Sequence, residues 1–425
     1  MTVQDNTGQA NTGQVDPGQV NLGQVDTGGP QVLSGIRVLD LSRWVSGEFA
    51  TKLFADFGAD VIKVEKPGEG SYTRHWGPFP GDKPDPEVSA LYLHLNTNKR
   101  SIALDLRGEA DRDLLLRLAE TADAVVESFR PGQLERLGLG PAELRARNPR
   151  LVVTRISPFG QDGPYRDYEA TGIVLQAMGG PMHATGEAGR SPQRKPGLLE
   201  HYTIGRTAGE ATLAGVFFAR RAGTGAVIDI SGQEVLLAGA DRRASYLLSA
   251  AYSGMNAPRG VRSAHRGAAT FTGPFRASDG YVMVYITNQE FWNRLIRLIG
   301  EGNQAFLDKF LNRIHLGDDW DEFITYLRAW FAARPKIELM TRCEAARIPL
   351  TAYLGMDELA ANEHFRGRDC FVAADHPVAG RLEYIGPPWR MRGGYRLRHA
   401  APLLDEHGAQ IRAEFEPATT RSSSS

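Results

Sequence analysis

The chain has 425 residues, of which 42% are hydrophobic and 23% are charged, proportions typical of a globular protein with roughly two domains. Its 49 basic and 50 acidic residues give a formal net charge of -1, which excludes a global field that attracts nucleic acid or a membrane surface. It has no run of about 18 apolar residues and no apolar leader segment. We therefore expect a soluble, cytoplasmic protein.

The first thirty residues repeat a five-residue unit: NTGQA, NTGQV, DPGQV, NLGQV and DTGGP. Gly, Asn and Gln dominate these units, which leaves too little apolar surface to offset the entropy of ordering. We predict a disordered tail over residues 1–30. The serine-ended segment 413–425 is predicted to be a second loose end.

The folded sequence begins with a strand–helix–strand pattern. A β-branched and leucine-rich run at 36–41 predicts a buried strand, and the apolar spacing at 47–57 predicts a helix that stops before Gly58. The run DVIKVE at 60–65 predicts the next strand. Such a unit implies parallel strands with a right-handed crossover.

The same alternation continues along the chain. Four further runs predict buried strands: 101–106, 124–128, 151–157 and 227–231. Three stretches with helical spacing lie among or after them: 109–122, 205–221 and 238–251. The predicted fold class is therefore α/β, with an open Rossmann-like parallel sheet covered on both faces by helices. The turn after the first strand, VLDLSRWVSGEF, holds one glycine rather than GxGxxG, so we expect neither NAD nor flavin.

The character of the sequence changes near residue 270. FTGPFRASDGYVMVYITN predicts a hairpin that turns at Asp279-Gly280, and an amphipathic helix follows at 289–299. Cys343 and Cys370 are too few for a disulfide framework, and no Cys/His cluster has metal-ligand spacing, so two reduced thiols and no metal are expected.

Several motifs resemble the class III CoA-transferase family, which includes formyl-CoA transferase, carnitine-type CoA-transferases and α-methylacyl-CoA racemase. The motifs run in the order of that family between residues 34 and 392. They are VLDLSRWVSGEFATKLFADFGADVIKVEKP, NTNKRSIALDLR, VVESFRPGQLERLGLG, NPRLVVTRISPFGQDGPY, IVLQAMGG, DGYVMVYITNQEFW and DHPVAGRLEYIGPPWR.

The resemblance implies an interlocked, ring-like homodimer in which each chain threads through the other. It also implies that the C-terminal stretch returns to the first domain. The expected organisation begins with residues 31–235, which form the N-terminal part of a large CoA-binding domain. Linker helices and a small α+β domain follow at 236–371, and residues 372–412 return to the large domain. Acyl-CoA is expected to bind on the large domain, with its thioester near the domain and subunit boundary.

CoA carries a pyrophosphate, a 3′-phosphate and an adenine, so its site favours fixed cations and exposed backbone N–H groups. Basic and aromatic side chains stand close to the ends of the predicted strands, where open sheets bind ligands. This reasoning selects Lys66, Lys99, Arg100, Arg107, Phe129, Arg130 and Arg136, with a structural role as the alternative for Arg100. By resemblance, the CoA-contacting positions are Lys66, Leu104, Arg107, Ser128, Phe129 and Arg136.

The stretch GLLEHYTIG, residues 197–205, precedes the predicted helix at 205–221. In the transferases that this chain resembles, an aspartate here attacks the thioester and carries CoA. Counting back from AGTGAVIDIS places His201 at that aspartate, next to Glu200. The acid–base pair of the racemases is replaced as well, by Thr171 and Gly172.

Three readings of this exchange remain open. His201 can act as a general base, because the pKa of an imidazole lies near neutrality. It can instead be a polar residue that fills the vacated position, or Glu200 can serve as the nucleophile if the loop shifts by one residue. The corresponding functions are transfer of CoA or an acyl group from a CoA thioester to a small-molecule acceptor, α-proton chemistry on an acyl-CoA, and acyl-CoA binding without catalysis.

Overall fold

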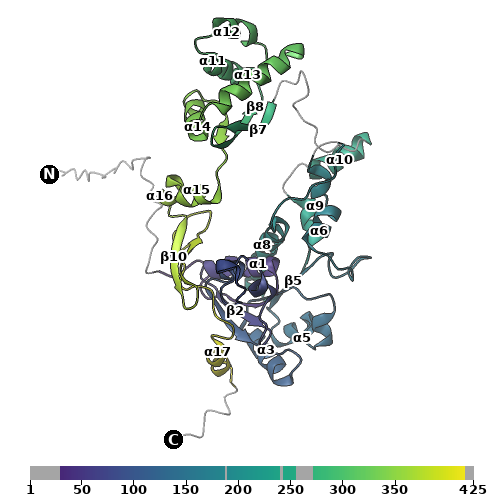
Figure 1. Cartoon of the computed structure of the whole chain (residues 1–425). Helices are drawn as coiled ribbons and strands as arrows, with labels where there is room; N and C mark the ends of the chain where they lie inside the picture. The colour runs from purple at the N-terminus through teal and green to yellow at the C-terminus, as the bar shows by residue number, and fades with distance from the viewer. Residues whose placement is uncertain (1–28, 187–188, 240–242, 255–270, 417–425) are drawn as a thin grey trace, which may run out of the picture. The chain divides into compact units, whose positions relative to one another are not determined.

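The computed structural model describes residues 29–186, 189–239, 243–254 and 271–416. The chain divides into two compact units (Figure 1). Among the described residues, the first unit comprises 29–181, 194–239, 243–249 and 369–416, and the second comprises 182–186, 189–193, 250–254 and 271–368. Residues 236–239 and 243–249, which the sequence assigns to the linker and small domain, group with the first unit. The predicted tails lie almost wholly outside the described residues, although helix α17 (Gly408–Glu414) extends two residues into the segment 413–425.

A six-stranded parallel sheet forms the centre of the first unit, as predicted. Its strands run in the order β3-β2-β1-β4-β5-β6, which reverses direction between β1 and β4. The strands are β1 (Arg37–Leu41), β2 (Asp60–Glu65), β3 (Lys99–Ala103), β4 (Ala124–Glu127), β5 (Val152–Ser157) and β6 (Val227–Ser231). This is the doubly wound arrangement that binds ligands at the strand-order reversal.

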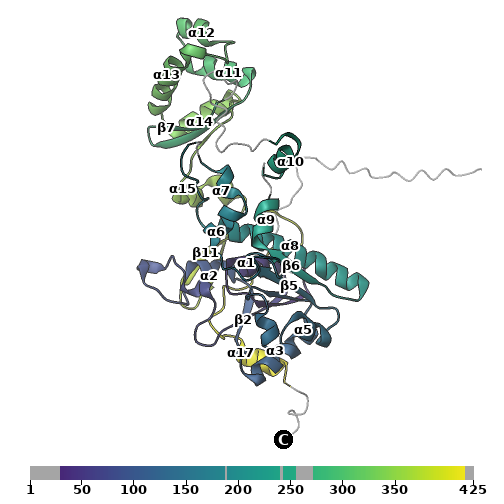
Figure 2. The ribbon, with the colours of Figure 1, turned by 90° about the vertical axis from the view of Figure 1, so that its right-hand side faces the viewer.

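Helices cover both faces of this sheet (Figure 2). Helices α1 and α8 lie on one face, and α3, α5 and α17 lie on the other. The α-helices of this unit are α1 (Val45–Asp56), α2 (Ala90–Leu95), α3 (Glu109–Thr121), α4 (Gln133–Arg136), α5 (Pro141–Arg147), α6 (Gly172–Met178), α8 (Leu199–Ala222), α9 (Gly232–Ala238) and α17. Two 3₁₀ turns are η1 (Tyr72–His75) and η2 (Pro80–Asp82). Helices α7 (Pro181–Ala184) and α10 (Arg243–Ser253) cross from one unit to the other.

Strand residues alternate between the two helical layers. In β1, Val38 packs in a cluster with Phe54 of α1 and Ala208 of α8. The next residue, Leu39, packs with Leu114 of α3 on the opposite face. Because most of the strands are buried on both faces, they are rich in β-branched and leucine residues, which explains why the sequence pattern identified them.

The chain returns to the first unit after residue 368. The antiparallel hairpin of β10 (Phe371–His376) and β11 (Gly380–Ile385) packs there, with Tyr384 in a cluster that also holds Tyr92 of α2. The segment after β11 packs beside the end of α1, where the ring of Trp389 stacks on Phe57 with ring centroids 4.9 Å apart.

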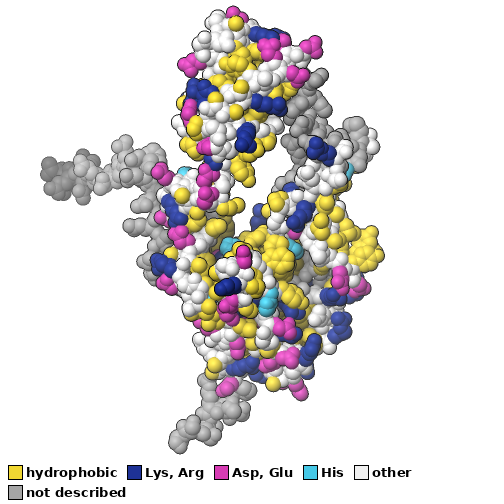
Figure 3. Space-filling model, viewed as in Figure 1, with side chains coloured by type: hydrophobic (Ala, Val, Ile, Leu, Met, Phe, Trp, Pro, Cys, Tyr) yellow, Lys and Arg dark blue, Asp and Glu magenta, His cyan; other side chains and the backbone are white. Residues whose placement is uncertain are grey.

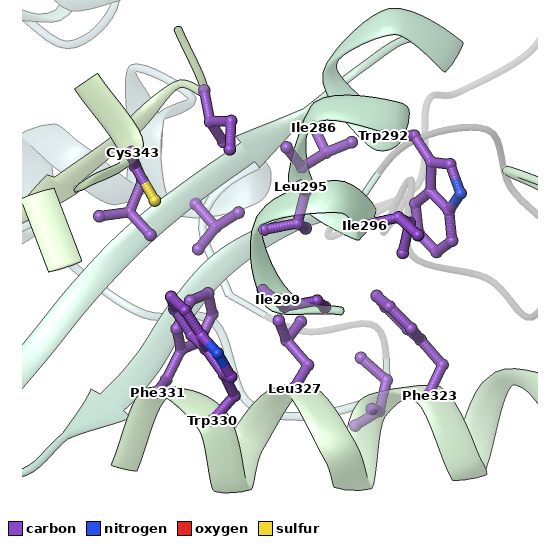
Figure 4. Close-up of a cluster of buried hydrophobic side chains, with 14 of the residues drawn as sticks. Ile286, Trp292, Leu295, Ile296, Ile299, Phe323, Leu327, Trp330, Phe331 and Cys343 are labelled. Carbon is purple, nitrogen blue, oxygen red and sulfur yellow. The ribbon is translucent and has the colours of Figure 1, made fainter. Parts of the chain in front are cut away.

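The second unit contains a three-stranded antiparallel sheet of β7 (Phe271–Ala277), β8 (Gly280–Ile286) and β9 (Leu350–Ala352). Its helices are α11 (Gln289–Ile299), α12 (Gln304–Phe310), α13 (Trp320–Ala332), α14 (Lys336–Ala345), α15 (Met356–Ala361) and α16 (Glu363–Gly367), with a 3₁₀ turn η3 (Gly317–Asp319). Trp292, Phe323, Leu327 and Phe331 are among the side chains of one apolar core, and the thiol of Cys343 lies in it (Figure 4). This agrees with the expected smaller α+β region.

One boundary differs from the sequence in a way that matters for the site. Helix α8 begins at Leu199 rather than at Gly205, so Glu200 and His201 lie in its first turn. The predicted loop is therefore helix. The start carries no sequence signal, because the residue before it, Leu198, makes no side-chain cap.

Candidate active site

A pocket of about 320 Å³ opens at the carboxyl ends of β1, β2, β3 and β4. Residues that follow each strand line it, beginning with Ser42 after β1, Lys66 after β2, Leu104 after β3 and Phe129 after β4. The pocket therefore sits at the reversal of strand order, where doubly wound sheets place their ligands.

The pocket wall carries several cationic groups. Five of the nine predicted CoA-binding residues line it: Lys66, Leu104, Arg107, Phe129 and Arg136. A further cation, Arg43, also lines it and stacks on the ring of Tyr72 at 4.3 Å. Sequence reasoning missed Arg43, although it follows β1 as Lys66 follows β2. On the face shown in Figure 3, basic and acidic side chains are interspersed. The pocket is therefore distinguished by several cations that line the same wall, not by a net positive charge of the surface.

Two of the predicted residues belong to the surroundings of the pocket. The Oγ of Ser128 accepts a hydrogen bond from the backbone N–H of Arg43 at 3.1 Å, which joins the loops after β4 and β1. Arg130 is exposed and forms an ion pair with Glu169. Neither is among the residues that line the pocket.

Lys99 cannot contact a ligand in this pocket, contrary to the sequence expectation. Its side chain is fully buried, and its ammonium group donates to Asp40, Thr51 and Asn96 at 2.8–3.0 Å. Burial lowers the pKa of Lys99, while the nearby Asp40 opposes that shift. Lys99 opens β3, so it lies at the amino end of the strand, away from the carboxyl edge.

Arg100 also lies away from the pocket. Its guanidinium group binds Asp60 at 2.8 Å and Glu414 of α17 at 2.9 Å. These contacts tie the C-terminal helix to the amino edge of the sheet, which is the structural alternative that the sequence left open.

Buried carboxylates fix the loops of the pocket. Asp40 accepts from the N–H of Ser42 at 3.0 Å, and Glu65 accepts from the N–H of Ser71 at 3.0 Å. Glu127 accepts from the N–H of Phe129 at 2.6 Å. Each carboxylate belongs to the end of a strand and holds the backbone that leads into the wall of the pocket.

A buried cation compensates each of these three carboxylates. The cations are Lys63 and Lys99 beside Asp40, Arg74 beside Glu65 and Arg155 beside Glu127. Burial alone would raise the pKa of Asp40, but the two lysines lower it to about 2. The carboxylates thus stay paired inside, while Arg107 and Arg136 lie on the wall together with Lys66, which forms an ion pair with the exposed Glu69.

Glu200 and His201 point to different neighbours. Glu200 is buried and accepts from the side-chain amide of Gln176 at 2.8 Å, and it packs so tightly on Gly172 that a Cβ there would lie 1.8 Å from its Oε1. His201 instead has its Nδ1 3.0 Å from the Oγ of Ser46. Ser46 lies in the first turn of α1, and no motif of the sequence singled it out.

Aromatic side chains surround His201. Its ring meets the edge of Trp44, with ring centroids 5.8 Å apart, and Trp44 in turn contacts Trp76 at 5.3 Å. Burial lowers the pKa of His201, and the neighbouring charge of Glu200 opposes this shift. The imidazole is therefore neutral near pH 7 and able to accept a proton.

Among the described residues, no group of three or more His, Cys, Asp or Glu side chains is arranged to hold a metal ion. Within the same part of the chain, no helix has the length and apolar character needed to span a bilayer.

Comparison with known proteins agrees with this geometry. A succinate–glutarate CoA-transferase of Agrobacterium fabrum is 32% identical over 90% of this chain and 96% of its own. An acetyl-CoA:oxalate CoA-transferase of Acetobacter aceti is also 32% identical, over 90% and 95%. A CAIB/BAIF family protein from Brucella suis superposes with a TM-score of 0.79 at 28% identity, covering 91% of this chain and all of the other.

The family model described as CoA-transferase family III matches residues 33–408. This span includes all four strand-end loops of the pocket and the first turn of α8. With a match over most of its length, the chain belongs to CoA-transferase family III.

Proposed function

We propose that this protein binds an acyl-CoA in the pocket at the carboxyl ends of β1–β4 and transfers CoA or the acyl group to a small-molecule acceptor. One observation carries the proposal: Lys66, Leu104, Arg107, Phe129 and Arg136, selected as CoA-contacting residues, converge on one pocket. Family membership supports the same substrate class.

The cations of the wall suit the phosphates of CoA. Lys66, Arg107 and Arg136 follow three different strands, so they approach a ligand from different sides of the pocket. Arg136 is the last residue of α4, which starts after Gly132 in a left-handed conformation with φ 76°. Arginine binds phosphate oxygens in a two-pronged geometry, and lysine acts as a point charge. Leu104 and Phe129 supply apolar contacts between these groups.

At the reacting end, we propose that His201 stands where the related transferases have their nucleophilic aspartate. The three sequence readings now differ in support. Glu200 is a poor nucleophile, because it is buried between Gln176 and Gly172 and turned away from the imidazole. The neutral state of His201 favours general-base work. The same neutral imidazole supports α-proton abstraction as a second candidate activity.

We also propose that the functional form is the homodimer, interlocked as the family resemblance implies. Exposed apolar side chains on the outer part of α8 support a partner surface: Leu213 and Phe217 are four residues apart and 43% and 63% exposed. Size-exclusion chromatography with light scattering tests this, and a monomer at micromolar concentration contradicts it. A cytoplasmic location remains a prediction from the sequence.

Calorimetric titration with CoA, followed by an exchange assay with labelled CoA, tests the function. We expect CoA to bind wild-type protein, and Arg136→Ala to weaken binding by about tenfold, the loss expected for one charge-assisted contact. The matched control is Arg150→Ala, because Arg150 is an exposed arginine just before β5, at the other edge of the sheet.

The outcome of the exchange assay separates the activities. A transferase exchanges label between an acyl-CoA and an acceptor, whereas an α-proton enzyme incorporates solvent deuterium into acyl-CoA without any acceptor. Binding with neither reaction identifies a non-catalytic homologue. If no CoA binds, or if both arginine variants weaken binding equally, the pocket is wrongly assigned.

A further inference from the structure

Ser46 lies at a position that suits a nucleophile. It is the second residue of α1, directly after the turn from β1. That turn is tight, because a Cβ on Gly47 would lie 2.1 Å from the Cβ of Ser42. Asp40 binds both the N–H and the hydroxyl of Ser42. The backbone around Ser46 is thereby fixed, and its side chain is only 6% exposed.

The contact between α1 and α8 brings His201 to this serine. Gly205 lies one turn after His201, on the same face of α8. A Cβ at Gly205 would lie 2.4 Å from the carbonyl oxygen of Ser46. The missing side chain lets the two helices approach at this point, which sets the 3.0 Å separation between Ser46 Oγ and His201 Nδ1.

Trp44 restricts the imidazole from another side. Its ring meets the histidine nearly at right angles, with an interplanar angle of 89°. In the tautomer that leaves Nδ1 unprotonated, the Ser46 hydroxyl donates to a packed, neutral imidazole, which is the arrangement of an activated serine. It needs both partners within hydrogen-bond reach, and residues 155 positions apart in the chain meet that condition here.

We propose that Ser46 is the acyl-accepting nucleophile of this enzyme and that His201 is its general base. The proposal rests on the proposed function, because the acyl donor is the CoA thioester bound in the pocket. It goes beyond that function by assigning the covalent intermediate to a serine ester.

The chemistry balances without an added co-reactant other than the acceptor. His201 Nδ1 takes the hydroxyl proton as Ser46 Oγ attacks the thioester carbonyl carbon. The C–S bond then breaks, and the thiolate of CoA leaves with the proton from the imidazolium. In the second half, His201 takes a proton from the acceptor, which attacks the ester and releases Ser46 with its proton restored.

The first turn of α1 suits the tetrahedral intermediate. The backbone N–H of Glu48 is the first to bond within this helix, to Trp44. The N–H groups of residues 45–47 precede that bond and belong to the positive end of a twelve-residue helix. An oxyanion that forms on the carbonyl attacked by Ser46 therefore develops next to favourable dipoles.

The intermediate restricts the class of acceptor. A carboxylate that attacks a serine ester would form an anhydride, which is far less stable than the ester. An alcohol, an amine or water forms a product of equal or greater stability. We therefore expect acyl transfer to an O–H or N–H acceptor rather than exchange of CoA between two carboxylates.

A serine-directed probe tests the dyad without knowledge of the acyl group. Full-length protein is incubated with an alkyl fluorophosphonate, and the modified peptide is mapped by mass spectrometry. We expect modification of Ser46, slowed at least about 100-fold in His201→Asn, the typical loss on removing a general base. His364→Asn, a control on the second unit, should react like wild type.

Turnover of acyl-CoA provides the second readout. Ser46→Ala should still bind CoA like wild type, yet lose acyl transfer at least about 100-fold. The dyad is wrong if wild-type Ser46 resists the probe, if label maps to another residue, or if Ser46→Ala keeps wild-type turnover. If CoA fails to bind while Ser46 is labelled, the proposed function fails and the activated serine stands.

Discussion

Gly205→Ala is expected to disturb the helix contact that holds Ser46 and His201 together. The added Cβ would lie 2.4 Å from the Ser46 carbonyl oxygen, and the positions of both atoms are fixed by the backbone. Normal contacts need about 3.5 Å, so α1 and α8 must separate by roughly 1 Å. No side-chain rotation can relieve this clash.

The magnitude follows from two opposing effects. Alanine stabilises a helix interior by about 1 kcal/mol relative to glycine. Overpacking at a backbone contact costs about 1–3 kcal/mol. We expect a net loss of about 0–2 kcal/mol in the free energy of unfolding, together with a longer Ser46–His201 distance. The distance matters more for function, since a hydrogen bond stretched well past 3.0 Å no longer transfers its proton.

Denaturant unfolding measures the stability, and the rate of fluorophosphonate labelling reports the dyad. Glu210→Ala is the control, because Glu210 is an exposed residue of the same helix; its effect should stay within about 0.5 kcal/mol. Unchanged stability with unchanged labelling in Gly205→Ala would refute the idea that this contact sets the geometry.

Three further predictions concern charged and titratable groups. Lys99→Met leaves the buried Asp40 with one cation fewer, and we expect a loss of about 3–5 kcal/mol in urea unfolding; a loss below 1 kcal/mol would show that Lys63 suffices. Arg155→Leu removes the cation beside Glu127, so the loop that begins at residue 129 should become less ordered. The affinity for CoA, measured by calorimetry, should then fall about tenfold. An unchanged affinity would show that the loop keeps its conformation without Arg155. Because burial lowers the pKa of His201 below its ordinary 6.5, serine labelling should be constant above pH 6.5 and decline only below it, as the imidazole becomes protonated; a midpoint above pH 7 would contradict the neutral imidazole.

The sheet was predictable because most of its strands are buried on both faces, although the edge strand β6 is exposed at Val227 and Asp229. Runs such as DVIKVE place β-branched residues at 61, 62 and 64, between which Lys63 and Glu65 are also buried. The strand ends as the place of a ligand followed from a general rule for open parallel sheets, whereas the order of the strands was not predicted. Leu104 and Ser128 were selected as CoA-contacting positions from the resemblance to a family, not from periodicity.

The errors in the site have physical causes. The third strand was expected at 101–106, and it runs from Lys99 to Ala103. In both cases Lys99 and Arg100 lie at its amino end, whereas doubly wound sheets bind ligands at the carboxyl ends of their strands. The sequence interpretation selected cations near either end of the strand, and only Arg107 lies beyond its carboxyl end. The pairing of Ser46 with His201 had no sequence signal at all, because it depends on where two helices cross.

Three glycines of helix α8 bring its backbone close to neighbouring residues at three points along the helix. Gly205 meets Ser46, and Gly209 and Gly215 would place a Cβ 3.2 Å from Leu53 and 2.8 Å from Val152. Together these three contacts fix the position of α8 along its length. The position of its first turn therefore does not depend on the side chain at residue 201. We therefore expect that a carboxylate and an imidazole can be exchanged at residue 201 without moving its Cα. The chemistry at this position can then change while the fold stays the same.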